Sequence, residues 1–224
     1  MDEPPIAWPG VLEPSLMSEE TVTAGHKMAD AAEAGDWPAL FDLLDADPAL
    51  SANQWRPGST DWVTPLHQAA RHGAPTKVVA ALIERGALRS LRDARGWAAR
   101  DVAFAHRHPI PLISLLIPPA SPLSMERTRA LDANLEWVIH GSVRAAGILD
   151  GHTDRDLHRV LRLPPVAVLH EAPGRSVQLV IPRIPGGIRV TLCANYLETA
   201  GAGQRHVITH RGAVLVAEDG AGTA

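Results

Sequence analysis

The sequence predicts two consecutive domains of different class, a helical repeat array followed by a small α+β domain. Short segments with apolar residues three or four positions apart recur every ~34 to 38 residues up to residue 118, which is typical of helical repeats. From about residue 166 the apolar residues alternate with polar ones, which is typical of β-strands. A chain of 224 residues with 46% hydrophobic and 21% charged residues can bury both cores.

The composition excludes several classes of protein. The longest apolar run, Val78 to Ile83, has six residues, whereas a membrane-spanning helix needs about 20 and a signal-peptide core about 7 to 15. The single cysteine, Cys193, cannot form an internal disulfide or a cysteine-built zinc site. We therefore expect a cytoplasmic protein without a membrane segment or a bound cofactor.

Proline and small residues mark the predicted domain boundaries. Four prolines lie among acidic and small residues before Val22, where no helical or strand period is sustained, so this part is predicted to be extended. Pro118, Pro119 and Pro122 stop helix propagation and predict a linker. The predicted leader, repeat domain, linker and α+β domain are residues 1–26, 27–118, 119–127 and 128–224.

The second repeat carries the most specific pattern, Thr64-Pro65-Leu66-His67-Gln68-Ala69-Ala70-Arg71-His72-Gly73. Thr64 can accept hydrogen bonds from free N–H groups at the start of a helix, and Pro65 fits the first turn, where no donor is needed. His67 can bond backbone groups between units, so we expect it to be structural. Further helical segments are predicted within Ala29–Leu44, Lys77–Glu84, Gly96–Ala103 and Pro111–Ile117.

This pattern resembles the ankyrin-repeat family, in which a unit of roughly 33 residues carries Thr-Pro-Leu-His-x-Ala at its first helix. Residues 64–73 match that signature, and Asp93 and Gly96 match the hairpin before the next unit. The third unit departs from the pattern at residues 98–100, and the first unit lacks the tetrapeptide. The resemblance covers about residues 27 to 118 and implies three stacked helix pairs, which contact a partner through their hairpins and concave face.

The C-terminal domain combines a helix with several predicted strands. The residues expected on one face of the helix are Leu131, Leu135, Val138, Ile139 and Val143. Turn residues such as Pro185-Gly186-Gly187 separate the strands, which favours an antiparallel sheet. The predicted strands are Val166–His170, Val177–Ile181, Ile188–Cys193, His206–Thr209 and Ala213–Glu218.

The charges divide unevenly along the chain, although the formal net charge is only -4. Residues 1–61 hold twelve acidic residues against Lys27 and Arg56, whereas residues 71–107 hold eight basic and three acidic residues. The basic stretch is either an ordinary solvated surface or a patch that binds an acidic partner. For the second interpretation, the candidate partner-binding residues are Arg85, Arg89, Arg92, Arg95 and Arg100.

Two tryptophans, Trp55 and Trp62, are further candidate partner-binding residues. They lie in the loop from Asp45 to Val63, which is longer than the connection usual in ankyrin repeats. Tryptophan beside arginine is common in interface hot spots, but tryptophan side chains also pack loops onto a core. Partner contact and loop packing both stay open at these positions.

A metal site and a catalytic site can be considered in the C-terminal domain, but a structural role is favoured for the residues of both. His206 and His210 would share one face of a strand, but two ligands are too few for zinc. Cys193 and Asn195 could act with a histidine as nucleophile, orienting group and base, but no cysteine-protease pattern surrounds Cys193. The base would be His170, His206 or His210. A buried strand thiol is the more common case.

The remaining patterns assign no site. His106 and His108 lie at the turn between the helices of the third repeat, where we expect a structural role. The sequence contains neither a phosphate-binding loop of the GxxxxGK[ST] type nor a GxGxxG pattern after a strand. We therefore assign no catalytic, cofactor-binding or metal-binding residue.

The sequence favours a non-enzymatic protein that binds another protein with an acidic surface. Nucleic acid is the less favoured acidic partner, because the basic stretch holds few aromatic residues and the first repeat is strongly acidic. One alternative is an enzyme or small-molecule sensor whose active part is the C-terminal domain, with the repeats as a docking arm. Another is a bacterial immunity or antitoxin-like protein that neutralises its partner.

Overall fold

The computed structural model describes residues 5–148 and 157–218 of the chain. The chain forms two compact units. A repeat unit spans Leu12–Pro119, and an α+β unit combines Met1–Val11 with Ala120–Ala224. The N-terminal residues therefore belong to the same unit as the C-terminal part of the chain, although the whole repeat unit separates them in sequence.

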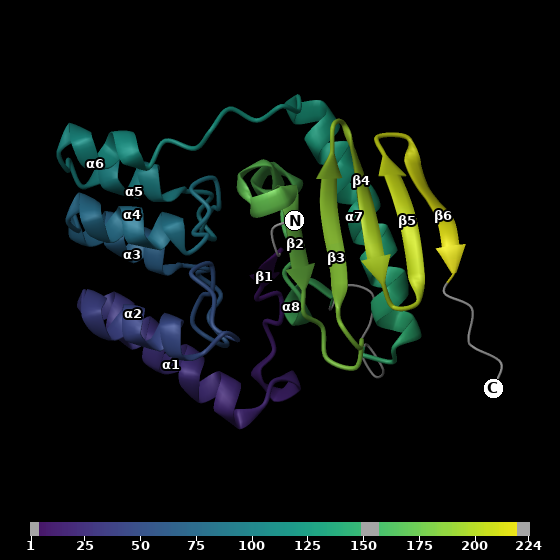
Figure 1. The fold of residues 1–224 in the computed structure, drawn as a ribbon, viewed down its shortest axis with the longest axis horizontal. Coiled ribbons are helices and arrows are strands. Elements are labelled where there is room, and N and C mark those ends of the chain that lie inside the picture. The colour runs from purple at the N-terminus through teal and green to yellow at the C-terminus, as the bar shows by residue number, and fades with distance from the viewer. Residues whose placement is uncertain (1–4, 149–156, 219–224) are drawn as a thin grey trace. The chain divides into compact units, whose positions relative to one another are not determined.

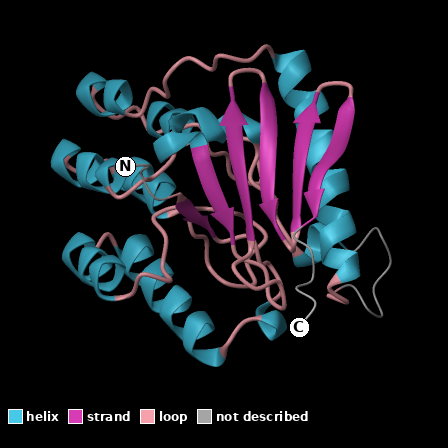
Figure 2. Cartoon of the chain, turned by 45° about the vertical axis from the view of Figure 1, so that its right-hand side comes forward, coloured by secondary structure: helices cyan, strands magenta, loops and turns pink. Residues whose placement is uncertain are grey.

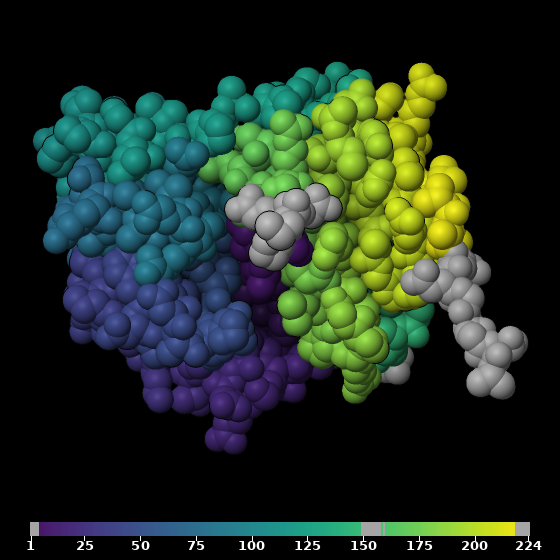
Figure 3. Space-filling view, in the orientation of Figure 1, coloured from purple at the N-terminus to yellow at the C-terminus, as the bar shows by residue number. Residues whose placement is uncertain are grey.

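The repeat unit consists of three helix pairs that stack in chain order (Figure 1, Figure 3). Helix α3 packs against α1 and α5, and α4 packs against α6. Small and aliphatic residues such as Ala69, Val79 and Ala103 are fully buried there, which lets the helices approach closely. The helices are η1 (Pro14–Leu16, 3-10), α1 (Glu19–Ala34), α2 (Trp37–Ala46), α3 (Pro65–His72), α4 (Thr76–Glu84), α5 (Ala99–Ala105) and α6 (Ile110–Leu115).

Short-range signals in the sequence set the limits of these helices. Ser18 and Asp36 cap α1 and α2, because their side-chain oxygens accept hydrogen bonds from backbone N–H groups three residues later (3.1 and 3.2 Å). Helices α1 and α3 end at Gly35 and Gly73, whose φ values of 71° and 62° are easily reached by glycine. The local sequence therefore sets where these helices begin or end.

The N-terminal segment differs from the extended leader predicted for residues 1–26. Helix α1 already begins at Glu19, and Ile6–Trp8 forms strand β1. Trp8 is buried, and its indole N–H donates a hydrogen bond to the carbonyl oxygen of Arg162 (2.7 Å). The apolar period does not reveal either element, because a three-residue strand is too short to show a period and α1 starts with the polar residues Glu19, Glu20 and Thr21.

The α+β unit is built on a six-stranded sheet whose strands lie in chain order. Strands β1 and β2 pair in parallel, and the other neighbours are antiparallel. Helix α7 (Met125–Ala145) covers one face of the sheet and packs against β5 and β6 (Figure 2). The strands are β1 (Ile6–Trp8), β2 (Ser176–Leu179), β3 (Ile188–Cys193), β4 (Tyr196–Gly201), β5 (Gln204–Thr209) and β6 (Gly212–Glu218); the short helices are α8 (Leu157–Val160), η3 (Val166–Glu171) and η4 (Pro173–Arg175).

Two elements of this unit differ from the prediction. Val166–His170, predicted as a strand, lies in the 3-10 helix η3. Pro165 precedes this helix, and the carboxylate of Asp132 accepts a hydrogen bond from the Val166 N–H (2.7 Å), so this backbone donor is satisfied outside a sheet. Strand β4 is not predicted, because its polar and small residues interrupt the apolar alternation.

Candidate protein-binding surface

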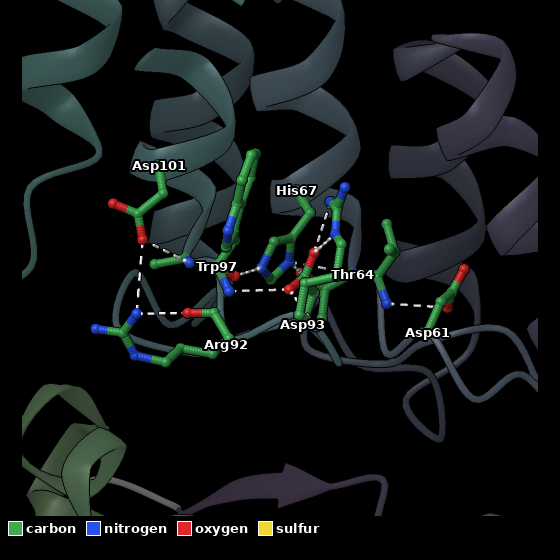
Figure 4. A network of polar contacts seen from close by, with 11 residues as sticks. Asp61, Thr64, His67, Arg92, Asp93, Trp97 and Asp101 are labelled. Atoms are coloured by element: carbon green, nitrogen blue, oxygen red, sulfur yellow. Dashed lines mark hydrogen bonds and ion pairs between the residues drawn. The ribbon is translucent and has the colours of Figure 1, made fainter. Parts of the chain in front are cut away.

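The connection between the second and third helix pairs is a hairpin organised around the carboxylate of Asp93 (Figure 4). One carboxylate oxygen accepts hydrogen bonds from the backbone N–H groups of Arg95 and Trp97 (both 2.9 Å). The other oxygen accepts two hydrogen bonds from the guanidinium of Arg95 (2.7 and 2.9 Å). Because the Asp93 side chain is 1% exposed, these charge-assisted bonds hold the hairpin in one conformation.

The pKa of the Asp93 carboxyl lies below its ordinary value. Burial alone would raise this pKa, but the hydrogen bonds from the Trp97 backbone and from Arg95 outweigh burial. Asp93 is therefore ionised at neutral pH, and its charge is part of the structure of the hairpin.

The hairpin presents two exposed guanidinium groups in fixed positions. The side chains of Arg92 and Arg95 are each 63% exposed. Arg95 lies over the ring of Trp97, 4.8 Å from its centroid. Arg92 donates a hydrogen bond to the carbonyl oxygen of Gly96 (2.6 Å) and lies 3.6 Å from a carboxylate oxygen of Asp101. Side chains that are already ordered lose less conformational entropy when a partner binds.

His67 connects this hairpin to the preceding helix pair (Figure 4). The Thr64 N–H donates a hydrogen bond to Nδ1 of the ring (3.3 Å), so Nδ1 is an acceptor and Nε2 carries the proton. Nε2 donates to the carbonyl oxygen of Trp97 (3.0 Å). His67 is 3% exposed, so its position is structural and the ring is not available to a partner.

The long loop before α3 is packed onto the repeat unit. Asn53 is buried; its Nδ2 donates to the carbonyl oxygen of Gly86 (2.8 Å), and its Oδ1 accepts from the Leu88 N–H (2.8 Å). Trp55 is 3% exposed. Of the two interpretations of this residue, loop packing agrees with the structure and partner contact does not. Trp62 is half-buried, with a φ of 56°.

The other predicted arginines occupy different environments. The guanidinium of Arg85 donates two hydrogen bonds to the Asp45 carboxylate (both 2.9 Å) and lies over the ring of Phe41. The hydrogen bond from Arg85 lowers the pKa of Asp45. Arg89 is half-buried, and Arg100 is exposed on α5. Arg92 and Arg95 thus share the hairpin, whereas Arg85 faces α2.

The structure separates Cys193 from His206, one of the three histidines considered as its base. On strand β4, Cys193 pairs with Tyr196 and His206 pairs with Thr199. Tyr196 and Thr199 are three residues apart, which corresponds to about 10 Å along a strand. Burial, followed by the nearby Glu198 carboxylate, raises the pKa of the Cys193 thiol. A thiol held protonated is a poor nucleophile.

The remaining histidines form no metal site in the described parts of the chain. The rings of His106 and His108 stack with centroids 5.9 Å apart, and His108 donates to the carbonyl oxygen of Arg71 (3.1 Å). His170 lies in η3, and His210 in the turn between β5 and β6. Within residues 5–148 and 157–218, no three His, Cys, Asp or Glu side chains are grouped to hold a metal ion. In the same residues, none of the helices combines the length and apolarity needed to cross a bilayer.

The stacked helix pairs, the Thr64–His67 start of α3 and the Asp93 hairpin are the defining features of the repeat unit. Residues 43–103 match the family model of ankyrin repeats. This ankyrin match confirms the resemblance seen in the sequence, and it contains both His67 and the hairpin. A comparison with curated proteins gives no match. Ankyrin repeats generally mediate protein–protein interactions, which makes the ankyrin hairpin the candidate binding surface.

Proposed function

We propose that this chain is a non-enzymatic binding protein whose ankyrin hairpins and concave face hold another protein with an acidic surface. The observation that carries the proposal is the pair Arg92 and Arg95, which the hairpin fixes while leaving both side chains 63% exposed. Ordered, exposed guanidinium groups can form charge-assisted hydrogen bonds with the carboxylates of a partner. A cytoplasmic location stays a prediction from the sequence.

The other candidate residues have graded roles in this proposal. Arg89 and Arg100 flank the hairpin in sequence and add positive charge, and Trp62 is half-buried. Arg85 contributes less, because its side chain is 33% exposed, against 63% for Arg92 and Arg95. Catalysis by Cys193 with His206 is not favoured, because strand β4 lies between their strands and their partners on β4 are three residues apart.

The test begins with capture of partner proteins from the native cell extract, followed by association kinetics of the purified partner. The informative variant is Arg89→Gln with Arg92→Gln, because a change at Arg95 would also release the Asp93 carboxylate that shapes the hairpin. Rim charges act mainly on the association rate, and salt screens them over about 8 Å at physiological ionic strength. We expect the variant to associate more slowly and to lose part of the salt dependence.

A matched control is Arg211→Gln, which removes an exposed arginine from the β5–β6 turn. Its association rate should equal that of the wild type. If the double variant also binds like the wild type, the basic stretch is ordinary solvated surface. Generic DNA and RNA are titrated over the same salt series, and tighter binding to either than to the captured protein would contradict a protein partner.

A further inference from the structure

The last helix pair carries large apolar side chains that are exposed. Phe104 on α5, Ile110 at the start of α6 and Ile117 just after α6 are 72%, 74% and 46% exposed. On the inner side of the same helices, Val102 and Leu112 are buried in the core of the repeat unit. A terminal repeat normally carries a polar outer face, because that face meets solvent. Exposed apolar residues at this end therefore indicate a surface that another element covers.

Basic residues surround this apolar surface. Arg100 lies one helical turn before Phe104 and so shares its side of α5. Arg107 follows α5 in the turn to α6, and both arginines are exposed. Asp101 is the exposed acidic residue of α5, and one of its carboxylate oxygens lies 3.6 Å from Arg92. We call Arg100, Phe104, Arg107, Ile110 and Ile117 the C-terminal end face.

The first helix pair, at the opposite end of the stack (Figure 1), has a groove of about 660 Å³ between α1 and α2. Apolar side chains of Ala24, Leu43 and Leu50 line it. Its acidic lining residues are Glu19, Glu20 and Asp47, against the single basic residue Lys27. We call this hollow the N-terminal groove. It is apolar inside and acidic in balance, whereas the C-terminal end face is apolar with basic neighbours.

We propose that the C-terminal end face of one copy of this chain packs into the N-terminal groove of a second copy, so that repeat units join head to tail. The apolar side chains of one surface then meet those of the other, and Arg100 and Arg107 approach the acidic lining. The contact continues the stacking order that α1–α3–α5 already follow within one chain. Because two different surfaces meet, the contact is heterologous and extends beyond two copies unless a ring closes.

This inference does not rest on the proposed function. The two share Arg100, but the inference uses neither Arg92 nor Arg95, and its test changes Phe104 and Ala46. Sedimentation velocity of the full chain over a wide concentration range tests it directly. We expect the average mass to rise with concentration and to fall with added salt. Phe104→Glu should weaken association by about tenfold or more, because it places a charge at the centre of the apolar surface.

A second variant blocks the other side of the contact. Ala46 is exposed and lines the N-terminal groove, so Ala46→Arg fills the groove with little effect on the core. It should weaken association by a similar factor. The control is Val214→Glu on β6, which makes the same apolar-to-acidic change at a side chain that is 63% exposed. The control should associate like the wild type, and circular dichroism should show equal folded content in all variants.

Mixing the two variants gives the decisive result. Phe104→Glu keeps an intact groove, and Ala46→Arg keeps an intact end face, so an equal mixture should form one-to-one dimers and nothing larger. Each variant alone should stay monomeric. A wild type that stays monomeric at every concentration overturns the proposal and leaves the groove to a different partner. Loss of association with Phe104→Glu but not with Ala46→Arg also overturns it, since two C-terminal end faces would then pair with each other.

Discussion

Replacing His67 by alanine is the sharpest test of how the repeat unit is held together. The imidazole accepts a hydrogen bond from the Thr64 N–H and donates one to the Trp97 carbonyl oxygen. It therefore bonds backbone groups that lie 33 residues apart in the sequence, one at the start of α3 and one in the Asp93 hairpin. Alanine keeps the helical backbone of α3 but satisfies neither group.

The size of the effect follows from the exposure of the two backbone groups that lose their partner. The Thr64 hydroxyl, which bonds the same ring nitrogen (2.8 Å), also loses it. Thr64 is 2% exposed, so its N–H becomes an unsatisfied buried donor, at a cost of about 1 to 3 kcal/mol. Trp97 is 39% exposed, so its carbonyl can take a water molecule and adds about 0.5 to 1 kcal/mol. We expect His67→Ala to lower the free energy of unfolding by about 1.5 to 4 kcal/mol.

Urea unfolding followed by circular dichroism measures this change. Because the chain has two compact units, the curve is fitted with two transitions, and the loss should appear in one of them. The control is His72→Ala in the same helix, an exposed histidine with one hydrogen bond to the Glu33 carbonyl oxygen (2.9 Å). That control should cost about 1 kcal/mol or less. If both variants unfold at the same urea concentration as the wild type, the assigned role of His67 is wrong.

Three further substitutions test other parts of the structure. Asp93→Asn should lower the free energy of unfolding by about 1 to 3 kcal/mol at pH 7. The folded-state pKa of Asp93 lies below the ordinary 3.8. The stabilisation by its charge is therefore present above pH 3.8 and is lost as the pH falls through the folded-state pKa. In acid, the free energies of unfolding of Asp93→Asn and the wild type, measured with urea, should differ less than at pH 7. Asn53→Ala should cost about 1.5 to 4 kcal/mol by urea unfolding, because the half-buried Gly86 carbonyl and the buried Leu88 N–H lose their partner. Gly201→Ala should speed amide exchange in β3 and β4, because its φ of 151° is strained for alanine and the added methyl group meets the Gly187 carbonyl.

The parts of the fold that could be predicted are those fixed by neighbouring residues. The start of α3 follows from Thr64 and Pro65, and its end from Gly73, all within ten positions. The strands β3 and β5 follow from the alternation of apolar and polar residues, which is also a pattern of neighbouring residues. A pattern of this kind needs no knowledge of the rest of the chain, because caps, turns and apolar periods act within a few residues.

The parts that could not be predicted depend on partners far away in the sequence. Strand β1 exists because residues 6–8 pair with residues 177–179. The residues near residue 6 contain no pattern that predicts this pairing. The burial of Trp55 is of the same type, since Asn53 bonds backbone groups more than 30 positions later. A tryptophan in a polar loop looks exposed when only its neighbours are considered. In the folded chain, the hydrogen bonds from Asn53 to distant backbone groups hold the loop against the repeat unit, and Trp55 is buried with it.

The charge asymmetry of the sequence has a further physical consequence in the folded chain. Arg56 binds the carboxylates of Asp30 and Glu33 (2.7 and 2.9 Å), and Arg85 binds Asp45. Arg85 of the basic stretch thus partly neutralises Asp45 of the acidic stretch, and Arg56 partly neutralises two carboxylates within the acidic stretch. Such exposed pairs add little to stability, because water and salt screen them. They do reduce the field that a partner meets, so attraction depends on how the fold places its charges and not on their number in the sequence.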